Sequence, residues 1–142
     1  MLDPGTRIST MKIDKNAKIL IAEDEPILRK VLHSMLVHFG FRYIYEAHNG
    51  VEALELGRKH QPRYALLDIY MPQMDGWEVA QYFKKELPDT IVIMITGSRD
   101  IADIDKSFVV EVDGYIYKPF QQDVLLKKIL DLTQQRQLLK DS

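Results

Sequence analysis

The sequence contains no cysteine among its 142 residues. Disulfide bonds, thiol catalysis and thiolate metal sites are therefore excluded, and the absence is compatible with a reducing compartment. The sequence also lacks an apolar run long enough to cross a bilayer, and its first residues do not form a basic-then-apolar signal pattern. From these absences we expect a cytoplasmic protein that does not enter a membrane.

An excess of positive charge is also missing. The formal net charge is −2 and the isoelectric point is near 6.1. A chain with this balance has no general electrostatic attraction to nucleic acid or to an anionic membrane. The four histidines are scattered, and we do not expect them to form a metal site. Nucleic-acid binding by this chain alone is therefore disfavoured.

The residues that are present have the composition of one globular domain. Hydrophobic residues make up 46% of the chain and charged residues 28%, and 142 residues are enough to bury a core. We expect a flexible polar leader over residues 1–16, one domain over 17–134 and a polar tail over 135–142. The tail is expected either to fray or to continue the last helix.

Short apolar runs alternate with segments in which apolar residues recur at helical spacing. The runs predict strands at 17–22, 41–46, 65–68, 90–95 and 115–117. The spaced segments predict helices at 26–39, 50–60, 77–86 and 101–109, and from 121 onward. Asn49 and Asp100 are expected to cap two of these helices, although the end of the 101–109 segment is also compatible with a strand. This alternation predicts an α/β fold with a five-stranded, doubly wound parallel sheet and helices on both faces.

Polar side chains close four of the five predicted strands. In chain order they are Glu23 with Asp24, then Asp68, Thr96 and Lys118. The carboxyl ends of parallel strands share one edge of the sheet, and that edge is where open α/β sheets bind ligands. We therefore expect three carboxylates, a hydroxyl and an ammonium group to converge there.

Such a cluster has an excess of negative charge. Two carboxylates about 4 Å apart repel by roughly 4 kcal/mol at an effective dielectric constant of about 20, and Lys118 can offset only one charge. An all-oxygen site of this kind suits Mg²⁺, which is commonly bound by a few carboxylates together with phosphate oxygens. Asp68 could then act as a nucleophile and form an aspartyl phosphate, with Glu23 and Asp24 holding the metal.

Four segments together resemble the response-regulator receiver domain of two-component signalling, which has a flavodoxin-like fold. They are ILIAEDEP at 19–26, LLDIYMPQMDG at 66–76, IMITG at 93–97 and YIYKPF at 115–120. Each segment alone is a weak signal. Their order and separation, covering the chain from about residue 18 to residue 133, make the resemblance specific.

The resemblance implies a role for each site residue. Asp68 would be the phospho-acceptor, and Lys118 would pair with the phosphoryl group. Thr96 and Tyr115 would form a coupled switch pair. The metal ligands would be Glu23, Asp24, Asp68 and the backbone carbonyl of Tyr70. The resemblance also implies a cis peptide bond between Lys118 and Pro119.

The function implied by the resemblance is a phosphorylation-dependent signalling switch. Asp68 would accept a phosphoryl group, in a Mg²⁺-dependent reaction, from a phosphohistidine of a sensor kinase or of a histidine phosphotransfer protein. The output surface would comprise the 101–109 helix, the 115–117 strand and the last helix, and it would contact an effector protein or a second copy of the chain. The protein would catalyse only its own phosphotransfer and dephosphorylation, and so would not be an enzyme in the usual sense.

Two other functions share parts of this pattern. A Mg²⁺-dependent phosphatase or phosphotransferase acting on a small substrate would use the same aspartyl phosphate, but the sequence offers no obvious acid–base partner beside Asp68 and no cap domain. A flavin or nucleotide binder is suggested by the fold alone, and no glycine-rich phosphate loop follows the first predicted strand.

The Arg29–Lys30, Lys84–Lys85 and Lys127–Lys128 pairs are interpreted as solvated faces.

Overall fold

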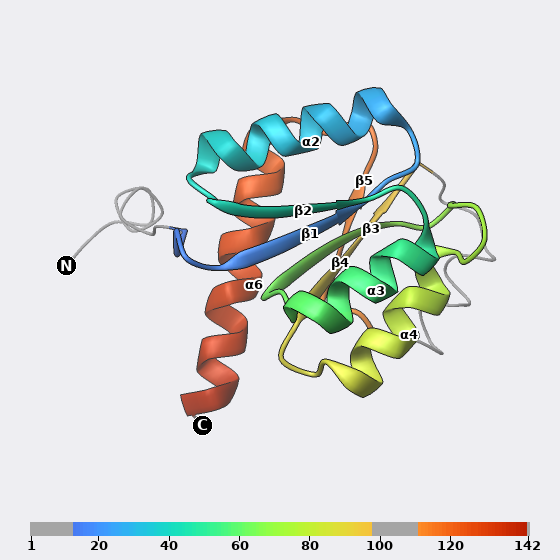
Figure 1. Ribbon diagram of the computed structural model, residues 1–142. Coiled ribbons are helices and arrows are strands. Elements are labelled where there is room, and N and C mark those ends of the chain that lie inside the picture. The colour runs from blue at the N-terminus through green and yellow to red at the C-terminus, as the bar shows by residue number, and fades with distance from the viewer. Residues whose placement is uncertain (1–12, 98–110, 142) are drawn as a thin grey trace.

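The computed structural model describes residues 13–97 and 111–141. Figure 1 shows a sheet with helices on its two sides. The elements in chain order are β1 (Lys18–Ala22), α2 (Pro26–Phe39), β2 (Tyr43–Ala47), α3 (Gly50–His60), β3 (Tyr64–Asp68), α4 (Gly76–Glu86), β4 (Ile91–Thr96), β5 (Gly114–Tyr117) and α6 (Gln122–Asp141). The predicted helix at 101–109, its cap Asp100 and most of the predicted leader lie outside the described residues.

The five strands are all parallel and are ordered β2-β1-β3-β4-β5. The chain therefore winds outward first on one side of β1 and then on the other. In sheets of this order, ligands bind outside the carboxyl ends of the strands where the winding direction changes, which here is between β1 and β3. The predicted doubly wound parallel sheet is confirmed.

Each strand supplies side chains to two separate cores, because successive residues of a strand point to opposite faces of the sheet. Leu20, Leu67 and Met94 belong to the core that also contains residues of α3 and α4. Ile21, Leu66, Ile93 and their neighbours belong to the core that also contains residues of α2 and α6. All residues of β3 and β4 are buried, which explains why these strands are nearly continuous apolar runs in the sequence.

Local signals account for most helix ends. The side chain of Asn49 caps α3, as predicted, by accepting a hydrogen bond from the backbone N–H of Glu52 at 2.8 Å. Asp75 caps α4 in the same way through the N–H of Glu78 at 2.9 Å. Helix α2 has Pro26 in its first turn and ends at Gly40, whose φ of 109° is a left-handed conformation that favours glycine.

The predicted strand boundaries differ from the structure by one or two residues. The predicted 41–46 strand begins at Tyr43, because Phe41 lies in the preceding turn and is buried edge-on against the ring of Tyr64. Strand β4 is shifted by one residue and includes Thr96. Thr90 precedes this strand, and its hydroxyl donates to the carbonyl of Pro62 at 2.6 Å. Hydropathy alone does not distinguish a buried turn residue from a buried strand residue.

Helix α6 continues through the polar segment after Thr133 as far as Asp141, in agreement with one of the two alternatives that the sequence predicts for this tail. Two long-range contacts of its second half explain why it continues. The hydroxyl of Thr133 is 2.7 Å from that of Tyr64, and a guanidinium nitrogen of Arg136 donates to the carbonyl of Pro88 at 2.9 Å. The helix is therefore held against the start of β3 and the segment that precedes β4.

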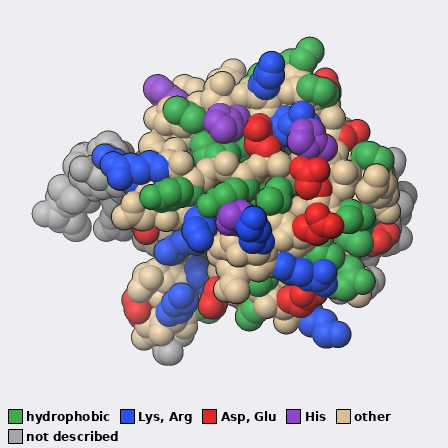
Figure 2. Space-filling view, in the orientation of Figure 1, with side chains coloured by type: hydrophobic (Ala, Val, Ile, Leu, Met, Phe, Trp, Pro, Cys, Tyr) green, Lys and Arg blue, Asp and Glu red, His purple; other side chains and the backbone are tan. Residues whose placement is uncertain are grey.

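The surface is of mixed character. Acidic and basic side chains are both spread over the face shown in Figure 2, with hydrophobic side chains between them, which fits the small net charge. In the described part of the chain, none of the helices has the length and hydropathy required to cross a membrane.

Candidate functional site

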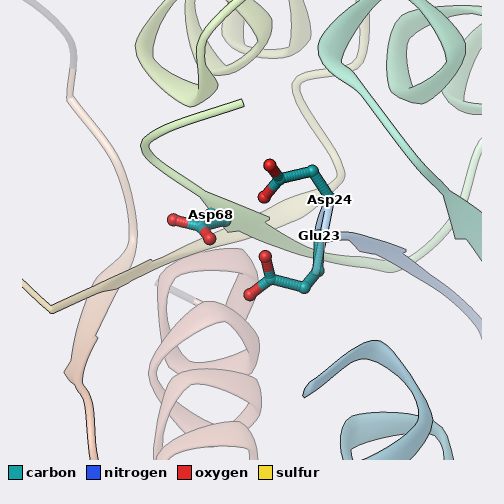
Figure 3. Close-up of side chains that lie close together, drawn as sticks. All are labelled: Glu23, Asp24 and Asp68. Carbon is teal, nitrogen blue, oxygen red and sulfur yellow. The ribbon is translucent and has the colours of Figure 1, made fainter. Parts of the chain in front are cut away.

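Three carboxylates meet at the carboxyl ends of β1 and β3. Glu23 and Asp24 directly follow β1, and Asp68 is the last residue of β3. One carboxylate oxygen from each of the three residues lies within 4.8 Å of the other two. Figure 3 shows the three side chains turned toward a common space. The predicted convergence of these acids is therefore observed.

Lys118 reaches the same cluster from the end of β5. Its ammonium nitrogen lies 2.9 Å from Asp68 Oδ2 and 3.1 Å from Glu23 Oε1. The Glu23 and Asp68 side chains are only 2% and 8% exposed, so these contacts are partly shielded from water. The backbone N–H of Lys118 also donates to the carbonyl of Thr96 at 2.8 Å, and the Lys118–Pro119 peptide bond is cis, as the resemblance implied.

The burial of like charges shifts the proton affinity of Glu23. Burial is the largest cause, and together with the adjacent Asp68 carboxylate it raises the pKa of Glu23 to about 7. Burial by itself lowers the pKa of Lys118, but the hydrogen bonds to Asp68 and Glu23 outweigh it, so this pKa is raised above its ordinary value. The ammonium group of Lys118 therefore stays charged, and it lies beside the Glu23 carboxyl group, which is readily protonated.

The backbone around Glu23 is held by two further contacts. A guanidinium nitrogen of Arg29, on α2, donates to the carbonyl of Glu23 at 2.8 Å. The N–H of Glu25 donates to Glu23 Oε2 at 3.2 Å. The interpretation of Arg29 as a solvated residue is therefore wrong. No local pattern in the sequence indicated that this side chain turns back toward the acidic turn.

The loop after β3 fixes the orientation of Asp68. The N–H of Tyr70 donates to Asp68 Oδ1 at 3.2 Å, while the side chain of Tyr70 is on the surface. The loop ends where the N–H of Gly76 donates to the carbonyl of Ile69 at 2.8 Å. A Cβ atom at position 76 would collide with the carbonyl oxygen of Asp68, so glycine permits this close approach. The role of the Tyr70 carbonyl as a metal ligand stays a prediction.

Thr96 and Tyr115 lie on the two strands beyond β3. Asp68 is in register with Ile95, so Thr96 is one residue farther along the neighbouring strand, and it is buried. Tyr115 is on β5, in register with Met94, and is partly buried. The backbone therefore brings both residues to the same half of the sheet as the acids, while their coupled movement stays a prediction.

The donor set fits a hard divalent cation. The carboxylates of Glu23, Asp24 and Asp68 supply oxygen ligands only, and three negative charges face one ammonium group. Asp24 is exposed, so one side of the cluster is open to solvent. Buried carboxylates in such close proximity are stabilised by a cation. The residues present are therefore suited to holding Mg²⁺.

Sequence comparisons agree with this geometry. Residues 19–130 match the family model described as the response regulator receiver domain. The chain is 34% identical over 123 residues to the probable transcriptional regulator ycf27 of Guillardia theta, covering 87% of this chain and 48% of the relative. It is also 34% identical over 104 residues to the probable C4-dicarboxylate response regulator DctR of Priestia megaterium, covering 72% and 46%. The chain thus spans about half the length of these curated relatives.

Structural comparisons give the same result. A CheY-like response regulator receiver domain protein from Methanospirillum hungatei JF-1 superposes with a TM-score of 0.80 at 28% identity, covering 86% of this chain and 98% of the other. A LuxR-family DNA-binding response regulator from Staphylococcus aureus superposes with a TM-score of 0.76 at 29% identity, covering 82% and 98%. Nearly the whole of each solved chain is therefore matched by the fold described above.

Proposed function

Because this chain belongs to the response regulator receiver domain family of two-component signalling, we propose that it is a switch that accepts a phosphoryl group on Asp68. One observation carries the choice of acceptor. Asp68 is a nearly buried carboxylate at the end of the central strand β3, and it is oriented by the Tyr70 N–H on one oxygen and by Lys118 on the other. Neither Glu23 nor Asp24 ends a strand in this way.

In the proposed reaction, a carboxylate oxygen of Asp68 attacks the phosphorus atom of a phosphohistidine. A P–O bond forms as the P–N bond breaks, and the imidazole leaves with the electron pair of that bond. The donor would be a sensor kinase or a histidine phosphotransfer protein. Mg²⁺ held by Glu23, Asp24, Asp68 and the carbonyl of Tyr70 would neutralise negative charge on the phosphoryl oxygens.

Lys118 is suited to stabilise the product. Its ammonium group is already shared between Asp68 and Glu23, at 2.9 and 3.1 Å. When Asp68 becomes an acyl phosphate, the phosphoryl oxygens offer Lys118 a stronger, charge-assisted partner. The acids and the lysine would thus perform only the protein's own phosphotransfer and dephosphorylation.

The output would follow from the charge added at Asp68. A phosphoryl group brings about −1.5 to −2 charges and new acceptor oxygens. The hydroxyl of Thr96 would donate to one of these oxygens, and Tyr115 would turn into the space that Thr96 leaves. A change from mostly off to mostly on requires phosphorylation to favour one state by roughly 5.5 kcal/mol, and a smaller bias would give a graded response.

The partners follow from the same proposal. The surface comprising residues 101–109, β5 and α6 would contact an effector protein or a second copy of this chain, and signalling would take place in the cytoplasm. The part of each curated relative that this chain matches is about half of that relative's length. The output of a full-length protein of this kind would therefore depend on residues beyond the receiver domain.

The proposal is tested by phosphorylating the protein with phosphoramidate and Mg²⁺ and measuring the intact mass. Wild type should gain one phosphoryl group, and Asp68→Asn should gain none. Asp75→Asn is a matched control in the same loop, since asparagine caps a helix as well as aspartate does. Labelling of Asp68→Asn at the wild-type rate would overturn the proposal.

A further inference from the structure

In the described residues, one buried side-chain hydrogen-bond donor has no acceptor. Trp77 is the single tryptophan of the chain, and its side chain lies in the core at the first turn of α4, where the residue is 3% exposed. Among the residues that the structure describes, its indole nitrogen Nε1 has no hydrogen-bond partner. Indole N–H groups can only donate, and nearly all buried donors are bonded. This donor therefore lacks an acceptor in the state described.

The indole group lies next to a residue of the proposed switch. The ring centroids of Trp77 and Tyr115 are 6.2 Å apart, and the two planes are inclined by 55°. Tyr115 is partly buried and packs against the core cluster that contains Trp77. A tyrosine hydroxyl carries an oxygen that can accept a hydrogen bond. Tyr115, whose ring contacts the indole ring of Trp77, therefore carries a suitable acceptor.

The backbone next to Trp77 is also packed against the end of the strand that carries Asp68. Its neighbour Gly76 donates to the carbonyl of Ile69 at 2.8 Å, and a Cβ atom at Gly76 would collide with the carbonyl oxygen of Asp68. The start of α4 is therefore packed directly on the backbone of Asp68. The indole group occupies a defined position relative to the acid cluster and to Tyr115.

A second buried side-chain nitrogen in the described residues, His33 Nδ1, also lacks a hydrogen bond, but its surroundings differ from those of the indole nitrogen. His33 Nδ1 lies 3.6 Å from Glu46 Oε1, so the imidazole has a carboxylate close by with which it pairs when protonated. The indole of Trp77 cannot titrate and has no such carboxylate among the salt bridges and hydrogen bonds of the described residues. A movement of a neighbouring group can supply its acceptor.

We propose that the Trp77 indole N–H donates a hydrogen bond to the Tyr115 hydroxyl oxygen when the Tyr115 ring turns inward. Trp77 is then a positioning residue, since it stabilises the inward position of the tyrosine without touching the phosphoryl group. The donor is held on a helix that is fixed against Asp68, so it is in place before the tyrosine moves. This inference rests on the proposed phosphorylation switch.

The test uses the indole group as its own reporter. With one tryptophan, the ¹H–¹⁵N spectrum contains a single indole resonance, which is followed as beryllofluoride and Mg²⁺ are added as a phosphoryl mimic. In wild type this resonance should move downfield and its hydrogen exchange should slow. In Tyr115→Phe, which keeps the ring and lacks the hydroxyl, both changes should be largely lost. An equal indole response in the two proteins would overturn the inference.

A double-mutant cycle gives a second measurement. Trp77→Phe keeps an aromatic ring and removes the N–H donor together with part of the ring volume, and it should weaken the apparent affinity for beryllofluoride by about fivefold, the effect of one ordinary hydrogen bond. In the Tyr115→Phe background the same substitution should cause no further loss. Equal losses in both backgrounds would show a purely structural role and would overturn the inference. If Trp77→Phe does not fold, the indole spectra of wild type and Tyr115→Phe still decide.

The same spectra separate this inference from the function on which it rests. If the mimic shifts the backbone amides around Asp68 and the indole response depends on the Tyr115 hydroxyl, both are supported. If those amides respond but the indole does not depend on Tyr115, only the Trp77 inference is overturned. If the amides around Asp68 do not respond at all, the proposed function and the inference are both overturned.

Discussion

Arg136 and Asp113 form an ion pair of 2.8 Å that joins the second half of α6 to the residue preceding β5. The same aspartate accepts the backbone N–H of Val92 at 2.7 Å and lies 3.3 Å from the ammonium group of Lys84 on α4. The Arg136 and Asp113 side chains are 17% and 19% exposed. Asp113 therefore links α4, β4, β5 and α6 at the edge of the sheet opposite the acid cluster.

Loss of this ion pair should destabilise the domain. We expect Arg136→Ala to lower the free energy of unfolding by about 1–3 kcal/mol, because it leaves a largely buried carboxylate with fewer partners. The matched control is Arg58→Ala, which removes a bidentate pair with Glu86 that is more exposed and should therefore lower the stability clearly less. Urea unfolding followed by circular dichroism measures both. Equal losses in the two variants would contradict the prediction.

The same ion pair predicts that the domain becomes less stable in acid. Burial raises the pKa of Asp113, but the hydrogen bonds from Val92 and Arg136 and the charge of Lys84 outweigh it, so the pKa is lowered. A carboxyl with a lowered pKa contributes stability above its unfolded-state pKa, and this contribution is lost as the pH falls below about 4. Asp113→Asn should therefore be less stable than wild type at pH 7, and the difference should shrink in acid. Unfolding measured between pH 7 and pH 3 checks this.

Glu23 should have the opposite pH dependence. Its pKa is raised to about 7 by burial and by Asp68, so without metal its contribution to stability is complete below its unfolded-state pKa and is lost as the pH rises through 7. The free energy of unfolding should fall across this range by up to about 3 kcal/mol. Glu23→Gln should remove this slope. Mg²⁺ affinity of wild type, measured by calorimetry, should rise with pH over the same range, since the metal competes with the proton on Glu23.

If the free energy of unfolding of Glu23→Gln depends on pH as that of wild type does, the assignment of this pH dependence to Glu23 is contradicted. Glu25→Gln is the control, because Glu25 is exposed and contacts Glu23 only through its backbone N–H.

Removal of the lysine should separate metal binding from phosphorylation. Lys118→Gln leaves Glu23, Asp24 and Asp68 without their ammonium partner, so Mg²⁺ affinity should stay the same or rise. The rate of phosphorylation by phosphoramidate should fall by about 10- to 100-fold, because a positive charge no longer stabilises the transferring group. Lys127→Gln, at an exposed residue that pairs with Asp131, should change neither. Parallel loss of metal affinity and rate in Lys118→Gln would contradict the proposed role.

The close approach of α4 to the acid cluster depends on Gly76. Gly76→Ala places a methyl group against the carbonyl of Asp68 and should destabilise the fold by about 1–3 kcal/mol, because the backbone must shift to accept it. Among the described residues, the atom nearest to the new methyl group in Gly97→Ala is 3.9 Å away on Lys118, so that variant should be nearly neutral. Thermal unfolding compares the two. A neutral Gly76→Ala would show that the loop adjusts freely.

Local pattern was sufficient to predict most of the fold. The apolar runs ending at Ala22, Asp68 and Thr96 have the composition of buried parallel strands, and Asn49 has the side chain that a helix start requires. Long-range partners were not predicted, because nothing near Arg29 or Arg136 in the sequence indicates what those side chains contact. For the same reason Lys84, interpreted as a solvated residue, proved to be paired with Asp113.

The sequence by itself determined which polar residues lie at or just after the ends of the strands, and it thereby determined the members of the acid cluster, since the alternation of apolar and polar residues is a local property. Only the tertiary structure decided how close those residues lie and how deeply they are buried. The sheet order places β1 beside β3, and the Lys118 side chain reaches both acids from the end of β5, although Glu23 and Lys118 are 95 residues apart in the chain. Burial and the nearby carboxylate then raise the pKa of Glu23, because the proton affinity of a group depends on its neighbours in space.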